Sequence, residues 1–114
     1  MATRTYKTLG AIFPAAATLS IAYTVPTGKT AVLSNIHVCN QSATPDKFRI
    51  VIIKATDIGG GVTAKNYVAY DVDIDGNDPV PCQLGATLGA GDQVRVYSLN
   101  GTLSFNIFGF EYSA

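Results

Sequence analysis

Two turn signals between alternating apolar runs constrain the fold of this chain more than any other feature. One is Asn100-Gly101, and the other is the segment 25–29, which reads Val-Pro-Thr-Gly-Lys. Asn-Gly between alternating apolar residues is the strongest short-range signal of a β-hairpin, because both central residues of a type I′ turn need a positive φ. We therefore predict a two-residue hairpin whose strands bring these apolar residues face to face: Val96 with Phe105, and Val94 with Ile107.

Eight alternating runs rich in Val, Ile, Thr, Tyr and Phe follow one another along the 114 residues, and no window has the apolar spacing of a helix. Turn residues such as Pro26, Gly28 and the triplet Gly59-Gly60-Gly61 separate most of them. The runs cover residues 6–13, 18–25, 30–39, 47–55, 66–74, 80–88, 92–99 and 102–112. This pattern predicts an all-β chain: a single-domain antiparallel β-sandwich over 1–114, jelly-roll-like, with about eight strands.

Alternation within the runs also predicts which side chains face the core. The expected inward sets are Val32, Ser34, Ile36 and Val38; Phe48, Ile50 and Ile52; Val68, Tyr70, Val72 and Ile74; and Leu103, Phe105 and Ile107. We expect Gly109 to be a bulge that resets the phase and turns Phe110 and Tyr112 inward. Phe108 would then face outward, either as a contact residue or as an edge aromatic covered by a loop.

The chain is poor in charge. Charged residues make up 14% of it, against about 25% in an average globular protein, while apolar residues make up 47%. Burial against copies of itself or against a partner explains this composition; the other explanation is a compact β-protein with many Ala, Thr, Ser and Gly on its surface. Eight basic and eight acidic residues cancel, so we expect neither nucleic acid nor a membrane as a partner.

The beginning of the chain has charges but no leader-like apolar segment behind them, and the apolar stretch 11–25 is shorter than the about 20 residues that span a bilayer. We therefore expect synthesis in the cytoplasm without a standard export signal. In that compartment Cys39 and Cys82 are expected to be two buried thiols, although a disulfide between them stays open. The segment 1–8 is expected either to lie as an arm over a neighbouring subunit or to be disordered.

No reactive constellation stands out. His37 is the only histidine, whereas the metal sites of β-barrel oxygenases need two or three histidines with a carboxylate. The chain has no G-x-S-x-G motif and no Cys-His arrangement beyond Cys39, two residues from His37. We expect no catalytic residue and no cofactor. Tyrosines on a sandwich face leave sugar binding open.

An aspartate run is the one candidate for a metal site. Asp71, Asp73 and Asp75, followed by Gly76, match the opening of a calcium loop, in which carboxylates at positions 1, 3 and 5 surround the ion. Position 12 is Cys82 where such a loop has glutamate, and the flanking segments read as strands. A solvated polar face of a strand is therefore the alternative to calcium binding.

Three segments, 23–40, 88–98 and 103–111, carry the pattern YTVPxGKTAVxSxIxVCN … LGAGDxVRVYS … LSFxxFGxE. This pattern resembles small virion structural proteins of tailed bacteriophages. The resemblance implies a jelly-roll or related β-sandwich that assembles on the particle, as a capsid decoration (cement) protein or a tail-associated protein. It brings no catalytic residues to this chain.

We therefore expect a non-enzymatic virion protein made in the host cytoplasm, foremost a decoration or cement protein that bridges capsomers and stabilises the head. Its partners would be the major capsid protein or other virion proteins, and copies of itself in a trimer. We expect contacts through the segment 1–8 and through three side chains: Arg95, Tyr97 and Phe108. The alternatives are a tail, fibre or baseplate component that contacts a host glycan through tyrosines, and a cupin-like enzyme, which the single histidine disfavours.

Overall fold

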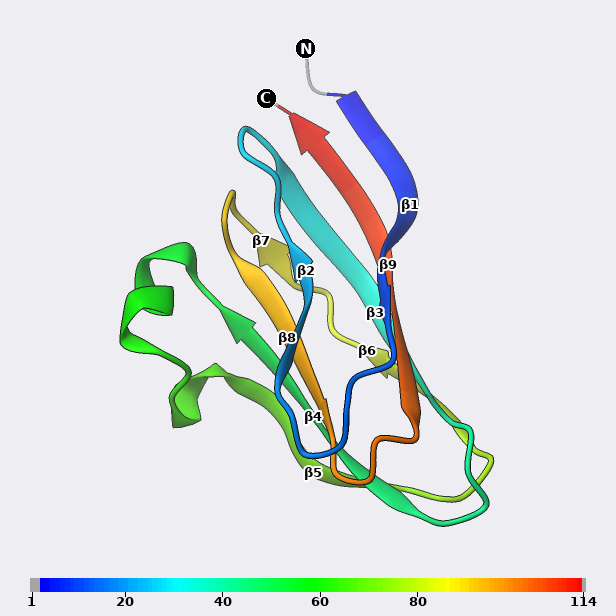
Figure 1. Ribbon diagram of the computed structural model, residues 1–114. Helices are drawn as coiled ribbons and strands as arrows, with labels where there is room; N and C mark the ends of the chain where they lie inside the picture. The colour runs from blue at the N-terminus through cyan, green and yellow to red at the C-terminus, as the bar shows by residue number, and fades with distance from the viewer. Residues whose placement is uncertain (1–2, 114) are drawn as a thin grey trace.

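The computed structural model is a sandwich of two antiparallel β-sheets (Figure 1). It describes residues 3–113, with side chains from residue 6 onward. Sheet A has the order β1 (Thr3–Ile12), β9 (Leu103–Ser113), β3 (Thr30–Asn40), β6 (Pro79–Gln83), and β7 (Thr87–Leu88) also pairs with β3. Sheet B has the order β2 (Ser20–Thr24), β8 (Gln93–Ser98), β4 (Asp46–Ile53), β5 (Tyr67–Ile74). The predicted all-β sandwich is confirmed.

Each predicted run contains one strand or, at 80–88, two. The break between β6 and β7 falls where Gly85 has a φ of 54°, and the backbone N–H of Leu33 donates to the carbonyl of Ala86 (2.8 Å) instead of continuing the ladder. The predicted turn at 25–29 is also confirmed: Lys29 N–H donates to the carbonyl of Pro26 (3.1 Å), and Gly28 has a φ of 78°. It carries the chain from sheet B to sheet A.

The predicted Asn100-Gly101 hairpin is wrong. β8 pairs with β2 and β4 in sheet B, whereas β9 pairs with β1 and β3 in sheet A. Of the two turn residues only Gly101 has a positive φ (74°), whereas a type I′ turn needs a positive φ at both, so the turn is not type I′. The inward sides of β8 and β9 are both fully buried, and two such strands bury more apolar surface across the sandwich from each other than side by side. The Asn100-Gly101 segment therefore links the two sheets.

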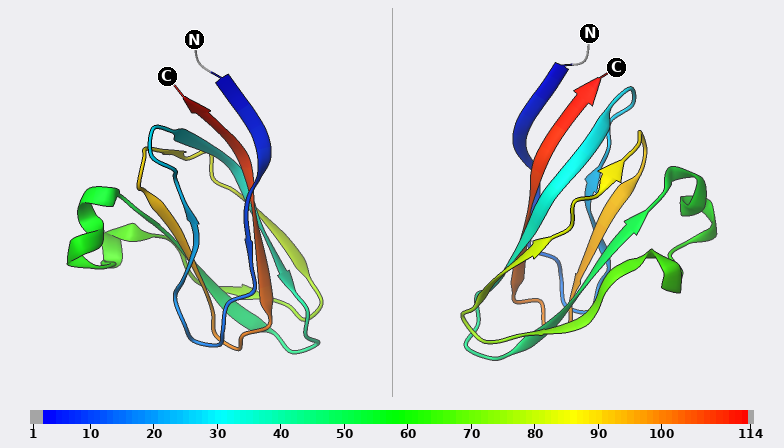
Figure 2. Two further views of the ribbon diagram at one scale, coloured as in Figure 1. Left: turned by 45° about the horizontal axis from the view of Figure 1, so that its top comes forward. Right: turned by 180° about the vertical axis from the view of Figure 1, so that it is seen from behind.

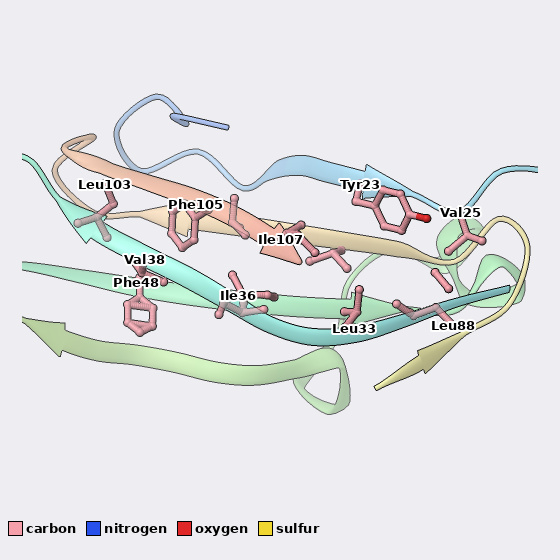
Figure 3. Close-up of a cluster of buried hydrophobic side chains, with 14 of the residues drawn as sticks. Tyr23, Val25, Leu33, Ile36, Val38, Phe48, Leu88, Leu103, Phe105 and Ile107 are labelled. Carbon is pink, nitrogen blue, oxygen red and sulfur yellow. The ribbon is translucent and has the colours of Figure 1, made fainter. Parts of the chain in front are cut away.

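The core lies between the sheets (Figure 3). Phe48 of sheet B and Phe105 of sheet A meet edge-to-face there, with ring centroids 6.3 Å apart. The predicted inward residues of β9 before Gly109 and the pairs Ile36/Val38 and Phe48/Ile50 are confirmed as buried. The largest fully buried side chains are Phe48, Phe105, Leu33, Ile36, Ile50, Ile53, Ile74, Leu88, Leu103, Ile107, Val25 and Val38.

A bulge overturns the predicted phase in the first half of β3. The register of β3 shifts between Leu33 and Asn35, so Leu33 is buried while Val32 and Ser34, which we predicted to face inward, do not enter the core. Because a bulge adds one residue to one strand, every later side chain changes face. In β4 the predicted phase is kept: Ile52 pairs with the buried Val94 and packs against the core, while Val51 and Ile53 lie on the other face by register and are buried there.

The prediction that β5 is a core strand is wrong except at its end. Val68, Tyr70 and Val72 are 48%, 58% and 39% exposed, and only Ile74 is buried. β5 is the edge strand of sheet B, and its register shifts opposite Arg49. An edge strand contacts the core from one side only, so its apolar residues stay accessible.

The predicted bulge at Gly109 is also wrong. Inward and outward residues alternate in β9 without a break from Leu103 to Glu111, which is buried, so Phe110 and Tyr112 face outward together with Phe108. The irregularities lie in the neighbouring strands, β1 and β3. A Cβ at Gly109 would lie 2.1 Å from the carbonyl oxygen of Val32, so glycine here permits the close approach of the bulged β3.

Among residues 3–113 no helix has the length and apolar character needed to cross a membrane.

Candidate functional site

The outer face of sheet A carries no Asp, Glu, Lys or Arg among its described side chains. The outward positions follow from the strand registers and from the buried positions between them. We call this surface the uncharged face. Its members are Tyr6, Thr8, Ala11, Thr30, Val32, Asn35, His37, Cys39, Pro79, Pro81, Gln83, Thr87, Ser104, Asn106, Phe108, Phe110 and Tyr112.

Four aromatic side chains form a strip along β9 and β1 on the uncharged face. The Tyr6 and Phe110 rings lie 4.9 Å apart between centroids, and Phe110 and Tyr112 lie 6.2 Å apart. Tyr6 is 70% exposed and Phe108 is 38% exposed. Depletion of charge and enrichment in aromatic residues distinguish the core of a protein–protein interface from the rest of a protein surface. The uncharged face has this composition.

The outer face of sheet B differs from the uncharged face of sheet A, because it carries ionised side chains. At its centre the guanidinium of Arg49 lies between two rings, 4.2 Å from the centroid of Tyr70 and 4.5 Å from that of Tyr97. Asp71 accepts two hydrogen bonds from Arg49, at Nε (2.7 Å) and Nη2 (3.3 Å). Lys47 donates to Asp73 at 2.6 Å in the next pair along the same strands.

A bulge in β5 builds this arrangement. Phe48 and Ile50 of β4 pair with Val72 and Ala69, so two residues of β5, Tyr70 and Asp71, oppose Arg49 alone. Asp71 has a φ of 51°, a left-handed conformation that non-glycine residues rarely adopt. The hydrogen bond with Arg49 lowers the pKa of Asp71 and raises that of Arg49, so both stay ionised at neutral pH.

Proline or a bulge interrupts each of the four sheet edges, and the bulge of β1, one edge of sheet A, lies between Thr8 and Gly10. Pro79 and Pro81 remove two backbone donors at alternate positions of β6, which forms one edge of sheet A. Bulges interrupt β5 opposite Arg49 and the five-residue β2 at Ala22. Faces are therefore better placed than these edges to associate with other subunits.

The structure separates the three predicted contact residues. Arg95 and Tyr97 lie outward on β8 of sheet B, where Arg95 donates to Gln93 Oε1 at 2.8 and 3.0 Å. Phe108 lies on the uncharged face of sheet A. A single flat partner cannot cover all three. In the segment 1–8, residues 3–8 form the first half of β1 and pair with β9, and residues 1–2 lie outside the described residues.

Two of the three aspartates of the predicted calcium site form ion pairs within the chain. Asp71 pairs with Arg49 and Asp73 with Lys47, while Asp75 is exposed beyond the end of β5. Among residues 3–113 no group of three or more His, Cys, Asp or Glu side chains is placed to hold a metal ion. Calcium binding stays a prediction.

Cys39 and Cys82 are free thiols, and both are half-buried. Cys39 is outward on β3 beside the position of His37, whereas Cys82 pairs with the inward Ile36 and packs against the core. The two cysteines therefore lie on opposite faces of sheet A. Burial raises the pKa of the Cys82 thiol.

Between β4 and β5 the chain makes an excursion with two short 3₁₀ helices, η1 (Ala55–Gly60) and η2 (Ala64–Asn66), that projects from the sandwich (Figure 2). An open hollow of about 540 Å³ lies where this excursion meets β5. Its lining residues are Val62, Thr63, Ala64, Tyr67 and Tyr70. Sequence reasoning missed the hollow, because it took Tyr70 as a core residue and the Gly59–Gly61 segment as a flexible loop.

No protein-family model and no curated protein matches this chain. Two solved structures that are similar to it are each described as a pentameric capsid protein isolated from metagenomic phage sequences. One is 22% identical with a TM-score of 0.43, over 96% of this chain and 65% of that protein. The other is 23% identical with a TM-score of 0.44, over 96% of this chain and 63% of that protein. This chain thus spans a little under two thirds of their length.

Proposed function

We propose that this protein is a non-enzymatic structural protein of a bacteriophage virion, foremost a capsid decoration or cement protein. The uncharged face is the observation that carries the proposal. An aromatic surface without ionised groups loses little on desolvation and gains from burial of apolar area. The sequence resemblance to small phage virion proteins indicates the particle on which such burial would take place.

The distribution of charge favours one side for attachment. On sheet B, Arg49 pairs with Asp71 and Lys47 with Asp73, and Arg95 donates to Gln93, whereas the uncharged face would associate without leaving a described charge buried and unpaired. A stable interface buries about 800 Å² on each partner. On a shell, many copies of a smaller contact would add to the same effect through multivalency.

The strand order supports the jelly-roll interpretation. Successive strands alternate between the sheets except for the pairs β4–β5 and β6–β7, with β1-β9-β3-β6 in one sheet, where β7 also pairs with β3, and β2-β8-β4-β5 in the other. If β6 and β7 are counted as one interrupted strand, this is the eight-strand order of two Greek keys, an architecture that viral capsid domains use. This support is by analogy of fold.

A matched pair of charge insertions tests the proposal. Phe108→Asp places a carboxylate on the uncharged face, where Phe108 is 38% exposed, and Ile21→Asp places one at an accessible apolar position of sheet B, where Ile21 is 52% exposed. We expect the wild type and Ile21→Asp to bind bare heads of the parent phage in a lattice stoichiometry and to delay heat-induced genome release. We expect Phe108→Asp to do neither.

Circular dichroism of both variants checks that they fold. Loss of head binding in Ile21→Asp but not in Phe108→Asp would assign attachment to sheet B and overturn the choice of face. Wild-type protein that binds no virion protein would overturn the virion role. Sedimentation equilibrium gives the size of the homo-oligomer, which we expect to be a trimer, and a pentamer or a monomer would correct that expectation.

The second candidate is a tail, fibre or baseplate component that contacts a host glycan. The tyrosine-lined hollow at β5 favours it, because this hollow lies on sheet B, away from the uncharged face. Binding to host cells without binding to heads would select this candidate.

A further inference from the structure

The hollow beside β5 has an amphipathic lining. Val62, Ala64 and the rings of Tyr67 and Tyr70 supply apolar surface, while Thr63 and the two phenols supply hydroxyl groups. The lining holds no charged residue. Its volume of about 540 Å³ is within the range of small-molecule sites. Because the hollow is open, a wholly apolar ligand would keep much of its surface in water.

Tyr70 is held in place before any ligand arrives. Its ring contacts the Arg49 guanidinium and meets the ring of Tyr67 at a centroid distance of 4.9 Å and an interplanar angle of 82°. The carboxylate of Asp71, whose backbone has a φ of 51°, holds Arg49 in this position through two hydrogen bonds. Tyr70 nevertheless remains 58% exposed. Strained residues persist where the surrounding structure over-determines them, and they cluster at ligand sites.

The opposite rim of the hollow is ordered as well. Asn66 is buried, and its Oδ1 accepts hydrogen bonds from the backbone N–H of Thr63 (2.8 Å) and from the Thr63 hydroxyl (3.2 Å). These bonds close a capping box around η2. Hydrogen bonds and ring contacts therefore hold residues on both sides of the hollow in place before binding, which reduces the entropy that binding costs.

Charge pairing narrows the chemistry of the ligand. Of the ionised groups near the hollow, Arg49 pairs with Asp71 and Lys65 with Asp57, whereas Arg95, in register with Tyr67 across Val51, donates to the neutral Gln93. The lining itself offers no charged group to a phosphate or a metal ion. A ligand with one apolar face for the Tyr70 ring and hydroxyl groups for the phenols and Thr63 fits this surface.

We propose that the hollow lined by Val62, Thr63, Ala64, Tyr67 and Tyr70 binds a neutral saccharide, with one sugar ring stacked on Tyr70. The apolar face of a pyranose ring matches an exposed tyrosine, and its hydroxyl groups remain hydrated at an open site. The proposal does not rest on attachment through the uncharged face, because the two surfaces belong to different sheets.

The test is an amide NMR titration of the full chain with methyl glycosides of glucose, galactose and mannose, N-acetylglucosamine and chitotriose, and a proline-rich peptide as the competing ligand class. We expect at least one saccharide to give saturating shifts confined to residues 62–70, with a dissociation constant of about 1 mM. Tyr70→Ala should weaken that binding at least about tenfold, and Tyr70→Phe should retain it.

Tyr97→Ala is the matched control, because it removes the same ring from the other side of Arg49, outside the hollow. It should bind the saccharide like the wild type. The proposal is overturned if no saccharide shifts residues 62–70, if the shifts persist in Tyr70→Ala, or if only the peptide produces them. Phe108→Asp should bind the saccharide normally, so failure of this site and failure of the virion interface are distinguishable.

Discussion

The phenol of Tyr23 donates a hydrogen bond to the buried carboxylate of Glu111, and this bond joins the two sheets. Tyr23 lies on β2 of sheet B and Glu111 on β9 of sheet A. The ammonium group of Lys7 on β1 lies 3.0 Å from the other carboxylate oxygen, Oε1. Burial and the neighbouring carboxylate raise the pKa of Tyr23, while the bond from Tyr23 and the proximity of Lys7 lower the pKa of Glu111.

Tyr23→Phe should destabilise the protein by about 2 kcal/mol, because it leaves a buried carboxylate without its main donor. Urea unfolding followed by circular dichroism measures the change. The matched control is Tyr112→Phe, since Tyr112 faces outward on β9. An equal and small effect of both substitutions would show that the Tyr23 hydroxyl contributes nothing.

Glu111 should make stability depend on pH. Its folded-state pKa lies below the ordinary value of 4.5, so the unfolded chain binds the proton more readily. The contribution is fully present above about pH 4.5 and is lost as the pH falls through the folded pKa. Glu111→Gln should remove this part of the acid destabilisation. Urea midpoints from neutral pH down to acid test it, and parallel curves for the two proteins would contradict it.

Asp46 should stabilise the segment that joins β8 of sheet B to β9 of sheet A. Its buried carboxylate accepts hydrogen bonds from the Ser98 hydroxyl (2.6 Å), the Thr102 hydroxyl (3.1 Å) and the backbone N–H groups of Asn100 (3.0 Å) and Lys47 (2.7 Å). Burial alone would raise the pKa of Asp46, but these bonds, with that of Ser98 the strongest, outweigh it and lower the pKa.

Asp46→Ala should therefore cost about 3 kcal/mol in unfolding free energy, because it strands several donors in or near the core. Asp75→Ala removes an equally charged but exposed carboxyl and should stay within about 0.5 kcal/mol of the wild type. Thermal unfolding of the two variants checks the contrast. Similar melting temperatures for both would mean that the inter-sheet link does not depend on Asp46.

Two glycine-to-alanine substitutions should differ in how much they destabilise the protein. At Gly109 a methyl group would lie 2.1 Å from the Val32 carbonyl oxygen, so β3 and β9 would have to separate, at a cost of about 2 kcal/mol. At Gly59 no atom lies within 4 Å of the added Cβ, and the change should stay within about 0.5 kcal/mol. Urea unfolding measures both, and an indifferent Gly109→Ala would refute the close approach.

The two cysteines should remain unpaired and differ in reactivity. Cys39 and Cys82 lie on opposite faces of β-sheet A, and burial raises the pKa of Cys82. Non-reducing mass spectrometry of air-exposed protein should find both thiols. Alkylation at neutral pH should label Cys39 before Cys82, since the thiolate is the reactive form. A loss of two mass units, or faster labelling of Cys82, would contradict this arrangement.

Edge position and bulges explain why part of the candidate site escaped sequence reasoning. Val68, Tyr70 and Val72 alternate as core residues do, yet β5 has a neighbour on one side only. Arg49 gave no signal in the sequence, because its partners come from β5 and β8. Sequence reasoning also missed part of the aromatic strip. It assigned the apolar Phe110 and Tyr112 to the core, whereas the buried residue between them is the charged Glu111.

The sequence by itself determined where the strands lie, where the Pro26–Lys29 turn falls and which residues of the regular stretches face the core, because these depend on neighbours along the chain. Only the tertiary structure decided that β8 and β9 belong to different sheets, that bulges reverse the faces of Val32 and Tyr70, and that the outer face of sheet A has no charge among its described side chains while that of sheet B does. Those features depend on contacts between strands far apart in sequence, where burying the most apolar surface outweighs the local preference of an Asn-Gly turn.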